Sequence, residues 1–501
     1  MNIDDYFRFD GLEKSIEKSI EMIYSPHNLK KFEYDKQKLS LRILYDGYTN
    51  IPKIYQLYFL DPLKNFIEKY DYSDILKALD TNAKFLKDML AAIKQRTDAS
   101  NNNDEQELKI LHAFDEVVSD LFDGYLSNAE RQNIKPPDFQ VLSPLVFFGD
   151  PFISPYVWSS NIAKKLGINI SFVCMPKSYA KNILLWSAVG HEVGGHDILQ
   201  ADKGLLQELG NTVYKDIKSK SKKFTRTQSI IINGKKVNSI IDFAANYWKY
   251  TIDETASDVC SILNLGPAAG IGLVVSLLSR SENTKFIDEF PVNEIHPIDV
   301  LRIFLVIEVV KKMNNLDIKI INGYVNLFEK IIDKYTQNNG ELKLYTTCLD
   351  GQRYNDIVIP CNEMREIVKI VANTIVFGNL KTLEDHCLAE INDWTNHDEV
   401  LVQRITKDLI NNKVPRLEPG PDGQQIYAAH VLAGGILAIA KSAQIEEVTI
   451  LCADSLNILF NENPVWQGFP IKYRSDADKH NLISLFPSTH NRNTNTKRKS
   501  N

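Results

Sequence analysis

The residues best suited to catalysis lie in segment 188–197, which reads AVGHEVGGHD. His191 and His196 carry imidazole rings, and neutral imidazole is a common ligand of zinc in proteins. Glu192 follows the first histidine, and a carboxylate in that position can take a proton from a water molecule at a zinc centre. The segment therefore predicts a Zn²⁺ site with His191 and His196 as metal ligands and Glu192 as the general base.

The spacing of the two histidines requires an irregular helix. Side chains four apart on a regular helix differ by about 40° around the axis, whereas side chains five apart, such as His191 and His196, differ by about 140°. A widened π-type turn between them would let both rings reach one ion. Gly194 and Gly195 lie at the right place for such a turn, because consecutive glycines weaken the regular helix and admit unusual backbone angles.

A third ligand is expected from an acidic helix downstream, in a segment that ends before Gly266 and Pro267. Glu254 and Asp258 are four residues apart, so they share one face of this helix. One carboxylate can then bind the metal while the other accepts the second ring N–H of a histidine ligand and fixes its tautomer. We assign Glu254 to the metal and Asp258 to His191.

Together the two segments resemble the glutamate-zinc metallopeptidases, in the variant with the longer H-E-x-x-x-H helix typified by dipeptidyl peptidase III. The resemblance covers His191 to His196 and Asp253 to Asp258. In that family the second residue of an acidic pair supplies the glutamate ligand, and here Asp253 stands in place of the first glutamate. The resemblance implies a zinc site and hydrolysis of peptide bonds, and it does not extend to the length of the released product.

Further candidates are one histidine and three tyrosines. His296 follows the acidic helix at a distance where related peptidases keep a histidine that hydrogen-bonds the oxyanion, although a structural role at a helix start is equally open. Tyr250 is our candidate for substrate binding. Tyr250, Tyr247 and Tyr156 could also donate a hydrogen bond to the oxyanion, but single tyrosines more often belong to the core or rim. His430 lies in an apolar helix and is expected to be a core residue.

Two other classes of function remain open. One is a metal-dependent phosphohydrolase that uses the dipeptide His196-Asp197, although the histidine expected well upstream of that dipeptide is missing. The other is a noncatalytic helical interaction or effector protein in which the motif is structural. It predicts no bound metal and no thermal shift with a chelator.

Composition and charge limit the partners. The chain has 501 residues, 44% of them hydrophobic and 24% charged, which is typical of a globular protein with two or three domains or subdomains. A net charge of −6 argues against nucleic acid as a partner. The expected peptide or protein substrate is what the resemblance to the glutamate-zinc metallopeptidases implies. The six cysteines are scattered and predict reduced core residues. The oligomeric state does not follow from the sequence.

Neither an export signal nor a membrane span is predicted. The N-terminus MNIDD carries acids where a secretory leader needs basic residues, so we expect a cytoplasmic location, with export by a non-classical route left open. The most apolar stretches, 266–278 and 426–440, fall short of the roughly 20 residues that cross a bilayer. Both are expected to be buried helices.

The predicted fold class is α+β, predominantly α-helical, with small β-hairpins or a short sheet beside the metal-binding helices. Helices are expected at residues 11–20, 73–93, 108–126, 179–186 and 251–265. A polar loop is expected at 97–104, a strand at 168–173 and hairpins at 229–237 and 342–359. By analogy, strand 168–173 could form the edge of the cleft and bind extended peptide backbone.

Four regions follow from the changes in composition. They are an N-terminal helical region (1–140), a metal-binding catalytic region (141–341), a C-terminal, mainly helical region (342–487) and a basic disordered tail (488–501).

Overall fold

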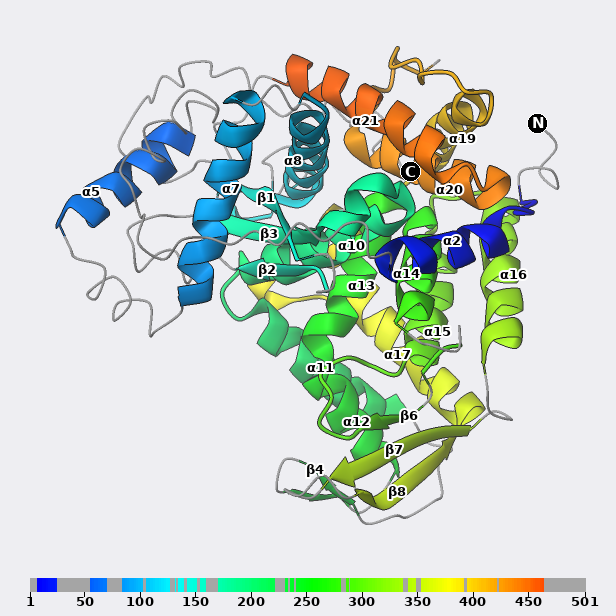
Figure 1. The fold of residues 1–501 in the computed structure, drawn as a ribbon. Coiled ribbons are helices and arrows are strands. Elements are labelled where there is room, and N and C mark those ends of the chain that lie inside the picture. Colours follow the sequence, from blue (N-terminus) through cyan, green and yellow to red (C-terminus); the bar gives the residue numbers. More distant parts are fainter. Residues whose placement is uncertain are drawn as a thin grey trace, which may run out of the picture.

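Helices make up most of the computed structural model of the chain, and its few strands form small sheets (Figure 1). This confirms the α+β, predominantly helical fold class. The structure describes residues 7–463 apart from 25–54, 70–82, 102–104, 127–130, 132–133, 139–141, 151–153, 159–169, 221–229, 233–234, 238–239, 281–284, 288, 337–340, 348–352, 392–393 and 421–422.

A three-stranded sheet lies beside the elements that carry His191 and His196. Its order is β1-β3-β2, with β3 parallel to β1 and antiparallel to β2. Every residue of β3 is buried, as expected for a central strand with an almost continuous apolar sequence. Helices α7 and α8 pack against β1. The bounds are β1 (Leu142–Gly149), β2 (Tyr156–Trp158), β3 (Ile170–Pro176), α7 (Ala83–Asn101) and α8 (Glu105–Leu126), preceded by α2 (Leu12–Tyr24), the π-helix η2 (Gln56–Leu60) and α5 (Asp61–Lys69).

Beyond β3 the chain enters the elements that carry the histidines and the acidic helix. Two 3-10 turns lead into the short helix α10, and α10 continues directly into a π-helix, η6. Helices α13 and α14 pack against α10, and α13 also packs against η6. The bounds are η4 (Lys177–Lys181), η5 (Ile183–Trp186), α10 (Ser187–His191), η6 (Glu192–Asp197), η7 (Ile198–Gln200), α11 (Leu205–Lys220), α12 (Ile240–Tyr250), α13 (Ile252–Leu265) and α14 (Ala268–Ser279).

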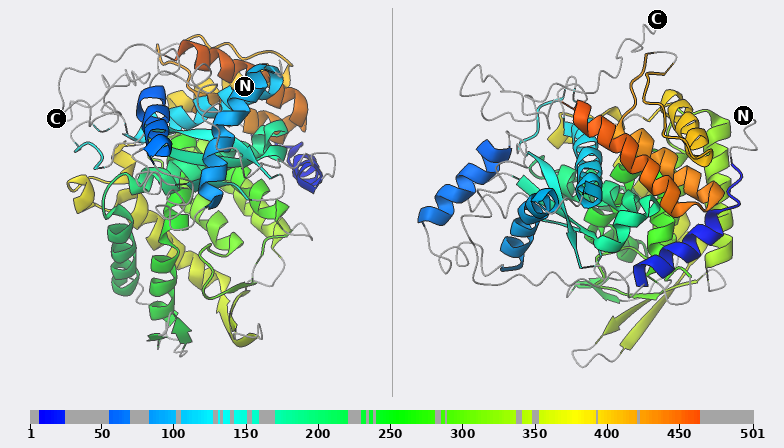
Figure 2. Two further views of the ribbon diagram at one scale, coloured as in Figure 1. Left: turned by 60° about the vertical axis from the view of Figure 1, so that its left-hand side comes forward. Right: turned by 45° about the horizontal axis from the view of Figure 1, so that its top comes forward.

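The remaining elements surround this centre. Strands β4, β5, β7 and β8 lie at one end of the molecule and helices α20 and α21 at the other, in Figure 1 and again in the left view of Figure 2. Buried apolar residues of helices α15 to α21 belong to one continuous core. The bounds are β4 (Ile230–Ile232), β5 (Lys235–Val237), β6 (Glu289–Pro291), α15 (Asp299–Val310), α16 (Ile318–Tyr335), β7 (Glu341–Thr347), β8 (Arg353–Pro360), α17 (Cys361–Phe377), η8 (Lys381–Leu383), α18 (Leu388–Ile391), α19 (Asn396–Ile410), α20 (Ala428–Ser442) and α21 (Ile445–Glu462).

Most of the elements predicted from hydrophobic periodicity are present. Helices α2, α8 and α13 and the strand pairs β4–β5 and β7–β8 lie where they were expected, while the two hairpin turns fall outside the described residues. Helix α7 covers the later part of the helix predicted at 73–93, whose first residues also fall outside. The basic tail lies wholly outside the described residues, and the boundaries at 140 and 341 stay predictions.

Two local predictions were wrong. The single helix expected at 179–186 is replaced by the two 3-10 turns η4 and η5, because Asn182 adopts an extended conformation between them and its side chain caps the second turn. Residues 97–101 of the loop expected at 97–104 belong to α7, and residues 102–104 fall outside the described residues. Residues 97–101 contain neither proline nor glycine, so nothing in them stops the helix.

Both apolar stretches are buried helices, as predicted. They form α14 and α20, and α14 packs against α20. Among the described helices, none combines the length and apolarity needed to cross a membrane. Five cysteines are buried, as predicted for core residues, and Cys348 lies outside the described residues.

Gly195 sets how closely η6 approaches α13. A methyl group on Gly195 would overlap the backbone Cα and the Cβ of Ser257 in α13. At Gly194 the nearest atom to a methyl group would be Asn264 Nδ2, at an ordinary 3.5 Å. The two neighbouring glycines therefore have different roles, and Gly195 is the one that the packing requires.

We predict that Gly195→Ala lowers the free energy of unfolding of the metal-free protein by about 1–3 kcal/mol, the usual cost of overpacking a core. Gly194→Ala should change it by less than about 1 kcal/mol. Urea denaturation of both variants measures the difference. Equal effects of the two substitutions would contradict this assignment.

Candidate metal centre

The two histidines predicted as ligands lie side by side. The π-helix η6 holds their ring centroids 4.8 Å apart, with the ring planes at 88°. The prediction of a π-type turn at the glycine pair is thus confirmed. On a regular helix, His191 and His196 would point in different directions.

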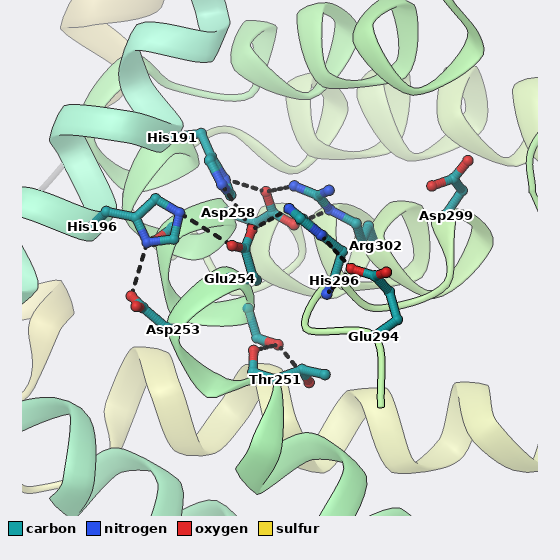
Figure 3. A network of polar contacts seen from close by, with 12 residues as sticks. His191, His196, Thr251, Asp253, Glu254, Asp258, Glu294, His296, Asp299 and Arg302 are labelled. Atoms are coloured by element: carbon teal, nitrogen blue, oxygen red, sulfur yellow. Dashed lines mark hydrogen bonds and ion pairs between the residues drawn. The ribbon is translucent and has the colours of Figure 1, made fainter. Parts of the chain in front are cut away.

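Glu254 of α13 lies between the two rings (Figure 3). Its Oε2 is 3.1 Å from His191 Nε2, and its Oε1 is 3.4 Å from His196 Nε2. Neighbouring ligand atoms in a tetrahedral zinc site are about 3.3 Å apart, given bonds of about 2.0 Å. One donor atom from each of the three residues lies within 4.8 Å of the others. His191, His196 and Glu254 could therefore hold a metal ion.

The second nitrogen of each ring contacts another carboxylate on α13. His191 Nδ1 lies 2.9 Å from Asp258 Oδ1, which confirms the contact assigned to Asp258. His196 Nδ1 lies 2.9 Å from Asp253 Oδ1 and 3.3 Å from Ser257 Oγ. With the protons on both Nδ1 atoms, the rings donate to these carboxylates and direct their Nε2 lone pairs toward Glu254. This is the tautomer that a metal ligand needs.

The charges of the cluster favour a cation. Burial opposes the charged imidazole, but hydrogen bonds to Asp253 and Glu254 raise the pKa of His196 well above its usual value. Burial likewise opposes the charged form of Glu254, but its bonds to His191 and His196 hold the pKa of this carboxyl far below its usual range. The carboxylates thus stabilise positive charge among the rings, which a divalent metal ion can supply as well as protons.

Arg302 was not predicted from the sequence and completes the network from α15. Its Nε and one terminal nitrogen each donate to Asp258 at 2.7 Å, and both side chains are buried. Burial raises the pKa of Asp258, but the charge of Arg302 and the bond to His191 outweigh it and lower this pKa to about 2. The sequence feature that could have indicated a buried ion pair is that Arg302 is a single arginine within the apolar run 300–307.

Glu192, the predicted base, lies at the same centre. It is 9% exposed and faces the cavity that contains the three candidate ligands. Burial raises the pKa of its carboxyl, and the neighbouring His191 and His196 lower it by a smaller amount. A raised pKa suits a group that must both accept and release a proton near neutral pH.

The cavity has a volume of about 600 Å³ and combines polar and apolar walls. Residues 154–158, which include β2, form one side. Strand 168–173, predicted as the cleft edge, was wrongly placed, because β3 lies between β1 and β2 with both sides paired. The strand beside the cavity is β2, which was not predicted from the sequence.

His296 also reaches the centre. Its Nε2 is 3.4 Å from Glu254 Oε2, and its Nδ1 is 2.7 Å from Glu294 Oε1 (Figure 3). The side chain is about one-third exposed and lines the cavity. Glu294 therefore orients His296 with Nε2 toward the candidate ligands, which favours the functional interpretation over a purely structural one.

The hydroxyl groups of the three candidate tyrosines contact residues other than the candidate metal ligands. Tyr250 is outside the residues that line the cavity, and its hydroxyl donates to the carbonyl of Asn293. The hydroxyl of Tyr247 accepts from the backbone N–H of Ile298. Tyr156 does line the cavity, but its hydroxyl donates to Asp88.

His430 and Asp197 lie in the core. His430 is 1% exposed and contacts Asp398 Oδ1 at 2.9 Å, as expected of a core histidine. Asp197 is buried, accepts from Ser171 of β3 and is not among the residues lining the cavity. His196 and Asp197 therefore face different surroundings.

Comparisons of the chain with protein-family models, with curated proteins and with solved structures give no match. The geometry of the metal centre is therefore the basis for assigning a function.

We predict that Asp258→Asn weakens zinc binding about 10-fold to 100-fold, because the amide no longer neutralises Arg302 or fixes the charge and tautomer of His191. Competition with a chromogenic chelator measures the affinity. The matched control is Asp202→Asn, because Asp202 forms an equally buried pair with Arg131. Arg131 donates two bonds to Asp202, of 3.1 and 2.6 Å, and neither residue lines the cavity. The same loss of zinc affinity in both folded variants would contradict a specific role for Asp258.

Proposed function

We propose that the protein is a zinc-dependent metallopeptidase. The observation that carries this proposal is the convergence of His191 Nε2 and His196 Nε2 on the two oxygens of Glu254, at 3.1 and 3.4 Å. Two imidazoles and one carboxylate leave a fourth position open, as catalytic rather than structural zinc sites do. The resemblance to the glutamate-zinc peptidases agrees with this ligand set.

Zinc bound by these three side chains would polarise a carbonyl group and lower the pKa of a bound water toward neutrality. Glu192 accepts a proton from the attacking water at its carboxylate and delivers it to the nitrogen of the leaving amine. Its burial supports this role, because the carboxyl is shielded from bulk solvent and its pKa is raised. Each cycle returns Glu192 to its ionised form.

His296 stabilises the negative charge that develops on the carbonyl oxygen. Its Nε2 is near Glu254, on the side of the metal ligands, and its Nδ1 is held by Glu294. In the doubly protonated ring, Nδ1–H donates to Glu294 and Nε2–H is left to donate to the oxyanion, so little rearrangement is needed as the charge develops.

Three observations support a peptide over a phosphoester as substrate. Strand β2 lies beside the cavity and pairs with β3 on one side, so its other side is placed to pair with an extended backbone. The volume of about 600 Å³ accommodates several residues. A phosphohydrolase built on His196-Asp197 would need Asp197 at the metal, whereas Ser171 holds it in the core.

A noncatalytic role is the second candidate. The paired histidines and carboxylates could stabilise helix packing without a metal, since the charges already neutralise one another. A buried Glu192 facing a cavity of this size favours catalysis. Stoichiometric zinc and a thermal shift on chelation are the results that separate the two.

We expect Glu192→Ala to keep one zinc ion per chain and to lower kcat/KM for peptide hydrolysis at least 100-fold, because the proton acceptor is lost. Zinc analysis and mass spectrometry of a digested peptide library measure the two quantities. Full zinc content with unchanged hydrolysis would rule out Glu192 as the base.

We expect His296→Gln to lower kcat about 100-fold with little change in KM, as for the loss of a donor that acts mainly in the transition state. Tyr250→Phe is the comparison, because the Tyr250 hydroxyl bonds a backbone carbonyl outside the cavity lining. This variant should stay within twofold of the wild type. A larger effect for Tyr250→Phe than for His296→Gln would restore Tyr250 as the functional residue.

A further inference from the structure

Two arginines line the cavity, and they differ in how fully they are bound. Arg302 donates from Nε and a terminal nitrogen to Asp258, at 2.7 Å each, so the edge of the guanidinium that could bind a carboxylate in paired bonds is already occupied. Arg280, at the end of α14, has one ion pair within the described part of the chain, with Asp299 through one terminal nitrogen at 2.9 Å. A guanidinium carries five N–H donors, so Arg280 has donors left for a ligand in the cavity.

Asp299 fixes the position of Arg280. It is fully buried at the start of α15, and its second oxygen accepts the backbone N–H of Ile287. Arg280 keeps 35% of its side-chain surface exposed and lines the cavity. The aspartate thus anchors one edge of the guanidinium while another edge stays accessible.

The cavity that Arg280 lines also has apolar walls. Helices α13 and α14 contribute aliphatic side chains to the same cavity, namely Ile262, Ala269, Leu273 and Leu277. Acidic residues are concentrated at the metal centre, where the lining includes Glu192, Asp253, Glu254 and Asp258. Among these lining residues, Arg280 offers an anionic group on a ligand a cationic partner.

We propose that Arg280 is a specificity-determining residue that binds a carboxylate of the peptide substrate, next to an aliphatic side chain. This deepens the peptidase proposal and rests on it. The carboxylate belongs either to the C-terminus of a short peptide or to an acidic side chain. Guanidinium and carboxylate form paired, charge-assisted hydrogen bonds, which are among the stronger polar contacts in proteins.

The test is direct binding to the hydrolysis-deficient, zinc-loaded Glu192→Ala protein, by calorimetry. The ligands are short N-acetylated peptides of alanine and leucine, offered as matched pairs. One pair compares a free C-terminal acid with the C-terminal amide. The other compares an internal glutamate with glutamine in amidated peptides. We expect the carboxylate form of one pair to bind about 10-fold to 100-fold more tightly, and that pair identifies the source of the carboxylate.

Substitution of Arg280 should remove this preference. With Arg280→Gln added, the two members of the pair should bind within twofold of each other, while Arg280→Lys keeps part of the preference. The double variant Arg280→Gln/Asp299→Asn removes both charges, so that no buried Asp299 is left unpaired, and should lose the preference as well. The matched control is Arg365→Gln, since Arg365 of α17 is ion-paired with Glu329 outside the cavity lining.

The failures of the two proposals are distinguishable. Absence of peptide cleavage by the wild-type protein counts against the peptidase and leaves the binding measurement intact. Equal binding of acid and amide, and of glutamate and glutamine, overturns the role of Arg280. A preference that persists in both Arg280→Gln and the double variant overturns it too.

Discussion

The contact between η6 and α13 is the constraint on which the metal centre depends. Gly195 allows η6 to touch the backbone of α13 at Ser257. One turn of α13 then presents Asp253 and Glu254 on one side of that contact and Asp258 on the other. The π-helix adds the remaining requirement, because it turns His191 and His196 toward the same point. Neither feature alone would bring the two histidines together with Asp253, Glu254 and Asp258.

The buried charges around the histidines are costly, and their arrangement offsets the cost. Asp258 and Arg302 lose hydration on burial, and such pairs are stabilising only when their remaining hydrogen-bonding groups find partners. Here one oxygen of Asp258 serves both Arg302 and His191, while the other serves Arg302. The pair thereby links α15 to the candidate metal ligands. The orientation of His191 in α10 is then fixed by contacts with α13 and, through Asp258, with α15. Such preorganisation is what a metal site needs if its ligands are to stay in place through a reaction.

The histidine spacing and the glycine pair were sufficient to predict the π-turn, because helix geometry leaves few other ways to bring rings five residues apart together. The Glu254 and Asp258 contacts also followed from helical spacing, since both lie on one face of α13. Arg302, Arg280 and β2 could not be predicted in this way. They reach the cavity through packing between distant segments, which periodicity does not encode. Strand 168–173 shows the same limit, because its pattern predicted a strand but not which neighbours would cover it.

The most direct test of the central claim is the position of the metal itself. An anomalous difference map from crystals of the zinc-loaded full-length protein, measured at the zinc absorption edge, would locate the ion. The account predicts one peak about 2.0–2.2 Å from His191 Nε2, His196 Nε2 and an oxygen of Glu254. A zinc-loaded crystal with no peak between these side chains, or with His191 and His196 turned apart, would contradict it.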